Sequence, residues 1–260
     1  MSYQSEVAAL SELQEAYSDE TKYRNLYLSL RRKRTDEELC LPIGGRWDGQ
    51  AHRYADHHPE VADVVSIALN DNQVPAARAY LEWLEARIEG RPRKRLLITG
   101  GDRRGGKSWL LTALACTTAI AIPGAIVWLI SPALNKREEL EKYVKGHLPR
   151  EWWQYSSRDL MFRLPNGSTI RNVTGDDADA LKRGEADLVC YNEPQLMVED
   201  VLTYGAPAII DKGGLLLFAG NPARRRKGVW FTRIVKAIES ERYEPGQFCR
   251  ISATANPDVD

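Results

Sequence analysis

The feature that most constrains this chain is the stretch GDRRGGKS at residues 101–108, which has the spacing Gly-x-x-x-x-Gly-Lys-Ser of a phosphate-binding loop. This pattern binds phosphate when it connects a buried strand to the N-terminus of a helix. The run 95–99 is apolar and rich in β-forming residues, and an apolar run of helix length follows Lys107 and stops at Pro123 and Gly124. Strand, loop and helix occur in the required order, so the sequence predicts a nucleotide site.

The residues of this loop have separate expected roles. Backbone N–H groups and the positive end of the helix dipole are predicted to surround the phosphates of ATP. Lys107 is expected to reach the β and γ phosphates, and the hydroxyl of Ser108 is expected to ligate Mg²⁺. The predicted nucleotide-binding residues are Gly101, Arg104, Gly105, Gly106, Lys107, Ser108, Trp109 and, further along the chain, Asn221.

Length and charge bound the possible functions. With 260 residues the chain has room for one good core and a smaller appendage. The formal net charge is zero, so no global field favours nucleic acid or a membrane surface. Basic residues nevertheless form runs at 31–34, 91–95 and 224–227, and each run fits either a DNA-facing stripe or a solvated face. No signal peptide begins the sequence, and its most apolar segment is interrupted at Pro123, so we expect a soluble intracellular protein.

Cysteines and histidines give no strong metal signature. The four cysteines are far apart, and three lie in predicted helices or strands, which predicts reduced core thiols of a cytosolic protein. The polar segment 52–58 contains three histidines and an aspartate but lacks the His-Glu-x-x-His helix pattern, so a polar loop explains it better than a metal site. The cysteines are Cys40, Cys116, Cys190 and Cys249.

The chain divides into two predicted regions. Residues 1–90 are expected to form an N-terminal helical, lid-like region, whose last helical stretch ends at Gly90. From residue 91 to 260, apolar strands alternate with helices, which predicts an α/β core of the ASCE-type P-loop NTPase class with a mainly parallel sheet flanked by helices. Within this core, Asn166-Gly167 separates two β-rich stretches and predicts a hairpin.

Two further strands end in polar residues that suit ATP hydrolysis. The segment DLVCYNEP predicts a strand that delivers Asn192 and Glu193, with Pro194 ending it. Glu193 is the candidate water-activating carboxylate, with a surface glutamate as the alternative, and Asn192 is the candidate metal-side residue. The segment LLLFAGNPA predicts a strand that places the amide of Asn221 near the γ-phosphate, although a strand followed by Asn-Pro is common.

These motifs, taken in order, resemble the ATPase domain of large terminase subunits, the DNA-packaging motors of tailed bacteriophages. The resemblance covers residues 95–260. It implies an ATP- and Mg²⁺-dependent motor that drives double-stranded DNA into a procapsid in the host cytoplasm. It also implies a homo-oligomeric ring that assembles from monomers and works with the portal and the small terminase subunit. Besides the loop, the segments that carry it are VWLISPA, FRLPNGSTIRNVTG, DADALKRGEADLVCYNEP, FAGNPARRRKGVWF and ATANPD.

The resemblance also suggests roles for three arginines. Arg103 looks like the counterpart of an arginine in the family's P-loop, where a guanidinium stabilises charge that spreads over the γ-phosphoryl oxygens. Arg104 acts there too or faces solvent, and a salt bridge to Asp102 or Glu193 is the structural alternative for both. Arg183 matches the family's Leu-Arg-Gly-like element and is a candidate arginine finger for a neighbouring subunit, or else a member of a structural ion pair.

Two departures from the family pattern keep other functions open. The family has Asp-Glu where this chain has Asn192-Glu193, and an amide brings no charge to the metal, so weaker Mg²⁺ binding is expected. The sequence stops at Asp260, whereas packaging terminases continue into a nuclease, so we expect an isolated ATPase domain without nuclease activity. The alternatives are a helicase-like or AAA-type P-loop ATPase, and an assembly module that binds nucleotide and barely hydrolyses it.

Overall fold

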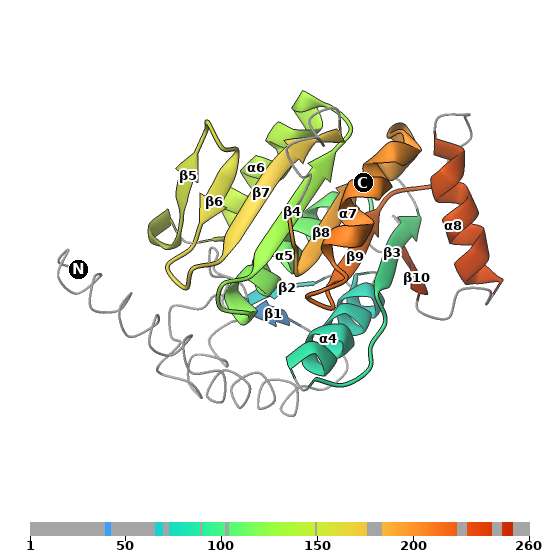
Figure 1. Cartoon of the computed structure of the whole chain (residues 1–260), viewed down its shortest axis with the longest axis horizontal. Coiled ribbons are helices and arrows are strands. Elements are labelled where there is room, and N and C mark those ends of the chain that lie inside the picture. The colour runs from blue at the N-terminus through green and yellow to red at the C-terminus, as the bar shows by residue number, and fades with distance from the viewer. Residues whose placement is uncertain are drawn as a thin grey trace.

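A computed structural model describes residues 40–42, 66–69, 73–88, 90–101, 104–148, 150–175, 184–222, 228–240 and 246–251. The described chain is built around an eight-stranded sheet with the strand order β10-β3-β9-β8-β4-β7-β6-β5 (Figure 1). In chain order, these strands are β3 (Leu96–Gly101), β4 (Ile126–Ser131), β5 (Gln154–Ser156), β6 (Met161–Arg163), β7 (Thr169–Thr174), β8 (Leu188–Asn192), β9 (Leu215–Ala219) and β10 (Gly246–Ile251).

Helices cover both faces of this sheet. Short 3₁₀ turns lie at Arg150–Trp152 (η2), Pro194–Leu196 (η4) and Glu199–Val201 (η5), and a separate antiparallel pair joins β1 (Cys40–Pro42) to β2 (Ser66–Ala68). The described α-helices are α4 (Val74–Ile88), α5 (Lys107–Ala121), α6 (Leu134–His147), α7 (Leu202–Ala208) and α8 (Val229–Glu239).

The sheet is parallel from β10 to β7, and β6 and β5 extend it in antiparallel fashion. Strand β9 lies between β3, which leads into the phosphate-binding loop, and β8, which carries Asn192. In a parallel sheet the carboxyl ends of neighbouring strands meet at one edge, so loops that are distant in sequence come together there. The predicted α/β P-loop fold with a mainly parallel sheet is confirmed.

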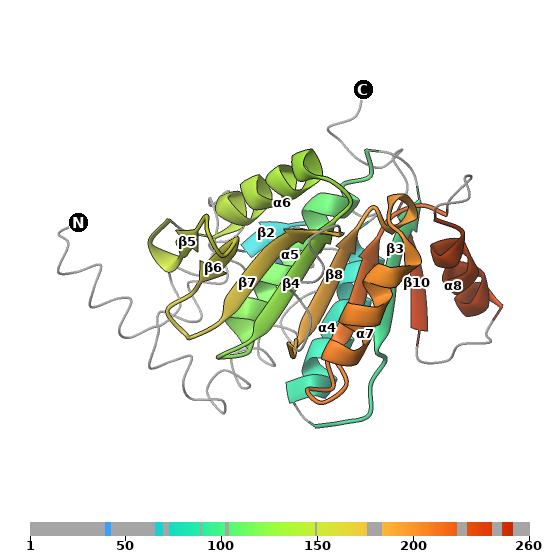
Figure 2. The ribbon, with the colours of Figure 1, turned by 45° about the horizontal axis from the view of Figure 1, so that its top comes forward.

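Two hydrophobic layers hold the helices on the sheet. Helices α4, α5 and α6 pack on one face and α7 and α8 on the other, as Figure 2 shows. Alternate strand residues face the two layers: Val127 and Leu129 lie in the α5 layer, and Trp128 and Ile130 lie in the α7 and α8 layer. Helix α5 is buried from Leu110 to Ala121, which explains why its sequence is apolar on all sides.

Helix α4 belongs to the same core although it precedes the predicted boundary at residue 90. Ala76, Tyr80 and Leu84 are fully buried in the α5 layer. The hydroxyl of Tyr80 also shares a hydrogen bond of 2.7 Å with Thr118 Oγ1 on α5. The core thus extends at least from α4 onwards, and the division into two domains stays a prediction, because the remainder of the N-terminal region lies mostly outside the described residues.

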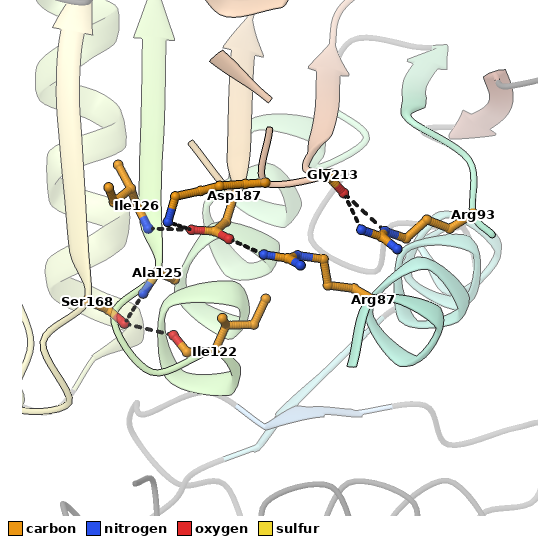
Figure 3. A network of polar contacts seen from close by, with 9 residues as sticks. Arg87, Arg93, Ile122, Ala125, Ile126, Ser168, Asp187 and Gly213 are labelled. Carbon is orange, nitrogen blue, oxygen red and sulfur yellow. Dashed lines mark hydrogen bonds and ion pairs between the residues drawn. The ribbon is translucent and has the colours of Figure 1, made fainter. Parts of the chain in front are cut away.

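A buried carboxylate, that of Asp187, links several segments at the amino ends of the strands (Figure 3). Asp187, which precedes β8, has a side chain only 2% exposed and pairs with Arg87 of α4. Its second oxygen accepts a hydrogen bond from the backbone N–H of Ile126 at 2.9 Å and lies 3.4 Å from Lys212 Nζ. Arg93 binds the carbonyl of Gly213 through two N–H groups. These contacts tie α4 and the segment before β9 to the end of the sheet opposite Asn192.

The predicted hairpin and the predicted burial of three cysteines are confirmed in the described residues. Strands β6 and β7 pair antiparallel around Asn166-Gly167, and Gly167 has the positive φ (82°) that such a turn needs. Cys116, Cys190 and Cys249 are buried free thiols, and burial raises the pKa of each. None of the described helices is long and apolar enough to cross a membrane. The polar segment 52–58 lies outside the described residues.

Candidate active site

The phosphate-binding loop leaves β3 at Gly101 and enters α5 at Lys107. Gly101 has a φ of 126°, and a Cβ added there would lie 2.0 Å from the carbonyl oxygen of Ile251 on β10. No other residue type fits without moving β10, so the first glycine of the pattern is required by the sheet as well as by the loop. The N–H groups in the first turn of α5 have no acceptor within the helix, which leaves them for an anion.

The second glycine of the pattern, Gly106, contacts Gln73, a residue that the sequence analysis missed. Gly106 has a φ of 74°, and a Cβ there would lie 2.6 Å from Nε2 of Gln73. Gln73 is almost fully buried at the start of α4, and its Nε2 lies 3.4 Å from the carbonyl oxygen of Gly106 as a long hydrogen bond. The residue just before helix α4 thus supports the phosphate-binding loop.

The two residues predicted to serve the metal lie in direct contact. Ser108 Oγ donates a hydrogen bond of 2.7 Å to Asn192 Oδ1, which joins the start of α5 to the carboxyl end of β8. Because the hydroxyl uses its proton in this bond, its lone pairs remain available to a cation. Lys107 is half-buried, and its Nζ donates to the carbonyl oxygen of Gly101 at 3.3 Å, folding the ammonium group over the loop.

Asn221 contacts the loop directly. The backbone N–H of Gly101 donates to Asn221 Oδ1 at 3.0 Å, so the turn after β9 is attached to the first residue of the phosphate-binding loop. The backbone N–H of Asn221 in turn lies 3.3 Å from Oε1 of Gln195 as a long hydrogen bond, and Gln195 follows Glu193 by two residues. The loop, the turn after β9 and the turn after β8 are therefore connected by hydrogen bonds.

Glu193 directly follows β8 and has a left-handed backbone conformation, with φ 54° and ψ 51°. Its N–H still donates to the carbonyl of Ala219 at 2.7 Å, so the strand stays paired up to the residue that turns. Its carboxylate lies 3.3 Å from Lys136 Nζ, and the same ammonium contacts Glu139 at 3.0 Å. The hydrogen bond to Glu139 and the charge of Glu193 raise the pKa of Lys136, although partial burial opposes the shift.

Backbone strain concentrates at this edge of the sheet. Among the described non-glycine residues, Arg104, Leu160 and Glu193 have positive φ values. Two of the three lie in the candidate site, where a left-handed conformation costs about 1–3 kcal/mol per residue. Such strain persists because the surrounding hydrogen bonds hold the two turns, and it sets the direction in which their side chains leave the backbone.

Trp109 packs behind the loop. Its half-buried ring meets the ring of His147 edge-on, with centroids 5.0 Å apart. His147 is buried beneath α5, where its Nε2 lies 3.1 Å from Thr112 Oγ1. Burial lowers the pKa of His147 to about 4, so the imidazole is neutral at physiological pH. Trp109 contacts the core in this structure, and its predicted role toward nucleotide stays a prediction.

Some predicted site residues cannot be placed in this arrangement. Arg103 and Arg183 lie outside the described residues, as does the basic run 224–227. Arg104 is exposed at the turn of the loop. Gly105 is buried beside Gly106 in the loop. The catalytic, nucleotide-binding and metal roles of all these residues remain predictions.

The residues at the edge of the sheet fit a magnesium ion. Mg²⁺ prefers oxygen ligands and keeps several of its waters. Ser108 supplies a hydroxyl oxygen there, beside a helix N-terminus that suits phosphate. Asn192 Nδ2 and Ser131 Oγ are buried and have no hydrogen-bond partner among the described residues, and the hydroxyl oxygen of Ser131 remains as an acceptor for the water shell of a metal. These residues would hold such an ion between α5 and β8.

Comparison with solved structures identifies the fold. The large terminase of the thermophilic bacteriophage D6E superposes with a TM-score of 0.55 at 14% identity, over 70% of this chain and 47% of that chain. The same terminase in complex with ADP gives 0.54 at 15% identity over the same shares. The bacteriophage HK97 large terminase gives 0.55 at 12% identity, over 75% of this chain and 41% of that chain. The fold is that of large terminases.

The resemblance to the terminase ATPase domain is therefore confirmed at the level of the fold. The chain spans less than half of the length of the D6E and HK97 terminases that it matches. No protein-family model and no curated protein sequence matches the chain. At this identity, the roles of individual residues depend on the geometry of the site itself.

Proposed function

We propose that this chain is the ATP-hydrolysing motor domain of a viral large terminase, which drives translocation of double-stranded DNA into a procapsid. The observation that carries the proposal is the contact between Ser108 and Asn192, with Glu193 at the next position. It joins a phosphate-binding helix N-terminus, a metal-side oxygen and a candidate base at one edge of a terminase fold. The D6E terminase has been solved with ADP and with ATP-γ-S, which supports a nucleotide as the ligand of this fold.

Each residue has a specific task in the proposed reaction. The N–H groups at the start of α5 bind the phosphates, and Lys107 leaves the carbonyl of Gly101 to contact the β and γ phosphates. Ser108 and Asn192 orient a metal ion, which neutralises charge on the phosphate oxygens when bound. Glu193 leaves Lys136 and accepts a proton from the attacking water.

The proposed assembly follows from the same function. The domain works as a homo-oligomeric ring with the portal, the procapsid and the small terminase subunit in the host cytoplasm, and it is a monomer in isolation. Arg103 stabilises the γ-phosphoryl charge in cis, and Arg183 does so in trans at the next subunit, where an arginine finger contributes roughly 10³ to 10⁵ in rate. Basic residues 224–227 contact the DNA backbone without sequence preference, so their contribution weakens with salt.

The proposal is tested by separating nucleotide binding from turnover. Lys107→Ala is expected to weaken ATP binding and abolish hydrolysis, whereas Glu193→Ala is expected to keep ATP bound and lose turnover by at least ~100-fold. Lys145→Ala, on the outer part of α6, is the matched control and is expected to change neither. Normal hydrolysis by Glu193→Ala would overturn the assignment of the base. DNA-independent turnover of an assembled ring would favour another P-loop ATPase.

A second function has one observation in its favour. Asn192 is fully buried and uncharged, and Glu193 is ion-paired, so this conformation offers no free carboxylate at either position. An assembly module that binds nucleotide and barely hydrolyses it fits such a site. Steady-state turnover, compared with nucleotide affinity, separates the two functions: submicromolar to micromolar binding with negligible turnover in the presence of DNA and procapsid would favour the module.

A further inference from the structure

Two buried polar atoms at the edge of the sheet have no hydrogen-bond partner among the described residues. They are Ser131 Oγ at the end of β4 and Asn192 Nδ2 at the end of β8. Both residues are fully buried. An unpaired buried polar group costs about 1–3 kcal/mol, and most buried polar groups in folded proteins are paired. Two such atoms in one place therefore indicate that a polar ligand completes the hydrogen bonding at this edge of the sheet.

The sheet register places the two residues side by side. Ile130 of β4 is the partner of Tyr191 of β8, so Ser131 lies level with Asn192 on the neighbouring strand, where paired backbones are about 4.8 Å apart. Side chains alternate along a strand, and Leu129 and Cys190 both lie in the layer beneath α5. Ser131 and Asn192 therefore project from the same face of the sheet, toward the start of α5.

Asn192 alone is poorly suited to order the water shell of a metal. Its Oδ1 already accepts the proton of Ser108, so the group left over is the N–H donor of the amide. A metal-bound water directs its lone pair at the metal and presents hydrogens, for which an N–H is the wrong partner. An aspartate at this position would offer a second oxygen to such a water.

We propose that Ser131 supplies the missing acceptor. Its hydroxyl oxygen has two lone pairs. With the metal bound, one would accept a hydrogen bond from a metal-bound water and the other would accept one from Asn192 Nδ2, which is not bonded to Ser131 in this structure. The pair of Ser131 and Asn192 then does what a carboxylate at position 192 does, without its charge. This inference rests on the proposed nucleotide and metal site. It makes Ser131 a positioning residue for the metal, and it gives each orphan atom a partner: Ser131 Oγ for Asn192 Nδ2, and the metal-bound water for Ser131 Oγ.

The test is a double-mutant cycle read as metal affinity. Mn²⁺ binding to the ADP complex is measured by electron paramagnetic resonance for wild type, Ser131→Ala, Asn192→Asp and the double variant. Ser131→Ala is expected to weaken Mn²⁺ binding by up to ~10-fold in the wild-type background, as for the loss of one hydrogen bond. Asn192→Asp strengthens Mn²⁺ binding, and in that background Ser131→Ala is expected to change it less than about twofold.

Two controls separate a metal role from a structural one. Ser131→Ala removes an unpaired hydroxyl, so it is expected to leave the unfolding temperature of the nucleotide-free protein unchanged or to raise it. Thr117→Val removes a buried hydroxyl of α5 that is hydrogen-bonded, so it is expected to lower that temperature and to leave Mn²⁺ affinity unchanged. Ser131→Cys keeps the side-chain volume with a weak acceptor, so it is expected to rank with Ser131→Ala.

Equal losses of Mn²⁺ affinity on Ser131→Ala in both backgrounds, or no loss in the wild-type background, would overturn the inference. ADP affinity in EDTA tests the proposed function separately. It is expected to be the same in wild type and Ser131→Ala, and lost in Lys107→Ala. A wild-type protein that binds no ADP overturns the proposed function, and the inference with it.

Discussion

Replacing three glycines by alanine, one at a time, measures how tightly the phosphate-binding loop is packed. Two of these glycines lie outside the loop and serve as references. Gly146 lies in α6 with no atom within 4 Å of an added Cβ, so Gly146→Ala is expected to stabilise by about 0.5–1 kcal/mol. Gly124 is equally open but has a φ of 72°. There the left-handed strain of about 1–2 kcal/mol is partly offset by the lower entropy of the unfolded chain, so Gly124→Ala is expected to destabilise by up to ~1 kcal/mol.

Gly101 adds a collision to the same kind of strain. A Cβ at Gly101 would lie 2.0 Å from the carbonyl oxygen of Ile251, which is backbone and cannot rotate away. Forced overpacking costs about 1–3 kcal/mol, so Gly101→Ala is expected to destabilise by ~2–4 kcal/mol in total. The change also displaces the N–H of Gly101 from Asn221 Oδ1, so ADP affinity is expected to fall in this variant alone.

Urea unfolding and ADP titration of the three variants check the order. The expected ranking of stability is Gly146→Ala above wild type, then Gly124→Ala, then Gly101→Ala. If Gly101→Ala unfolds at the same urea concentration as Gly124→Ala and binds ADP normally, β10 does not confine the loop, and the reasoning from the close approach of Ile251 is refuted.

Arg87→Met keeps the aliphatic part of the side chain but removes its ion pair with Asp187. Asp187 still contacts Lys212 and the N–H of Ile126. The loss of stability is therefore expected near the lower end of the ~3–5 kcal/mol that breaking a buried ion pair costs. Arg91→Met removes a half-exposed guanidinium that lies 3.7 Å from Glu85, and it is expected to cost less than ~1 kcal/mol. Equal losses of stability in urea would contradict the distinction. His147 has its pKa lowered to about 4 from 6.5 by burial. Stability is therefore full above pH 6.5 and lost as the pH falls toward 4, by up to ~3 kcal/mol. His147→Gln is expected to flatten this loss, and unfolding temperatures with equal pH dependence would contradict it.

Most of the fold could be predicted from local patterns in the sequence. The strand, loop and helix of the phosphate site appear as β3 and α5 within one or two residues of their predicted bounds, because apolar runs and glycine spacing are local signals. The apolar strand before Ser131 and the strand that delivers Asn192 were equally readable, since strands buried on both faces are continuously apolar.

Contacts between segments distant in sequence were not readable. Gln73 supports Gly106 across 33 positions, and nothing in the loop pattern specifies a glutamine before α4. The pairing of Glu193 with Lys136 depends on where α6 starts after β4, which periodicity gives only roughly. Ser131 ends an apolar strand, where serine is an ordinary residue. Its interest arises only from its register beside Asn192, which needs the strand order of the sheet.

The ion pair at Glu193 gives a last prediction about turnover. Lys136 is about one-third exposed and Glu193 about one-quarter, so their attraction is screened and such pairs are worth about 0.2–1 kcal/mol. The pair holds Oε1 against an ammonium group, where it is not available to water. Lys136→Met keeps the stem and frees the carboxylate, so basal ATP turnover is expected to rise by up to ~5-fold, the rate equivalent of that energy.

Lys145→Met is the matched control, because Lys145 also pairs with a glutamate of α6 but lies away from the loop. It is expected to leave turnover unchanged, and added salt is expected to raise wild-type turnover toward that of Lys136→Met before general inhibition sets in. A loss of turnover in Lys136→Met as deep as in Glu193→Ala would mean that Lys136 contacts the phosphates instead. The ammonium group of Lys136 would then take part in the reaction instead of holding Glu193 away from water.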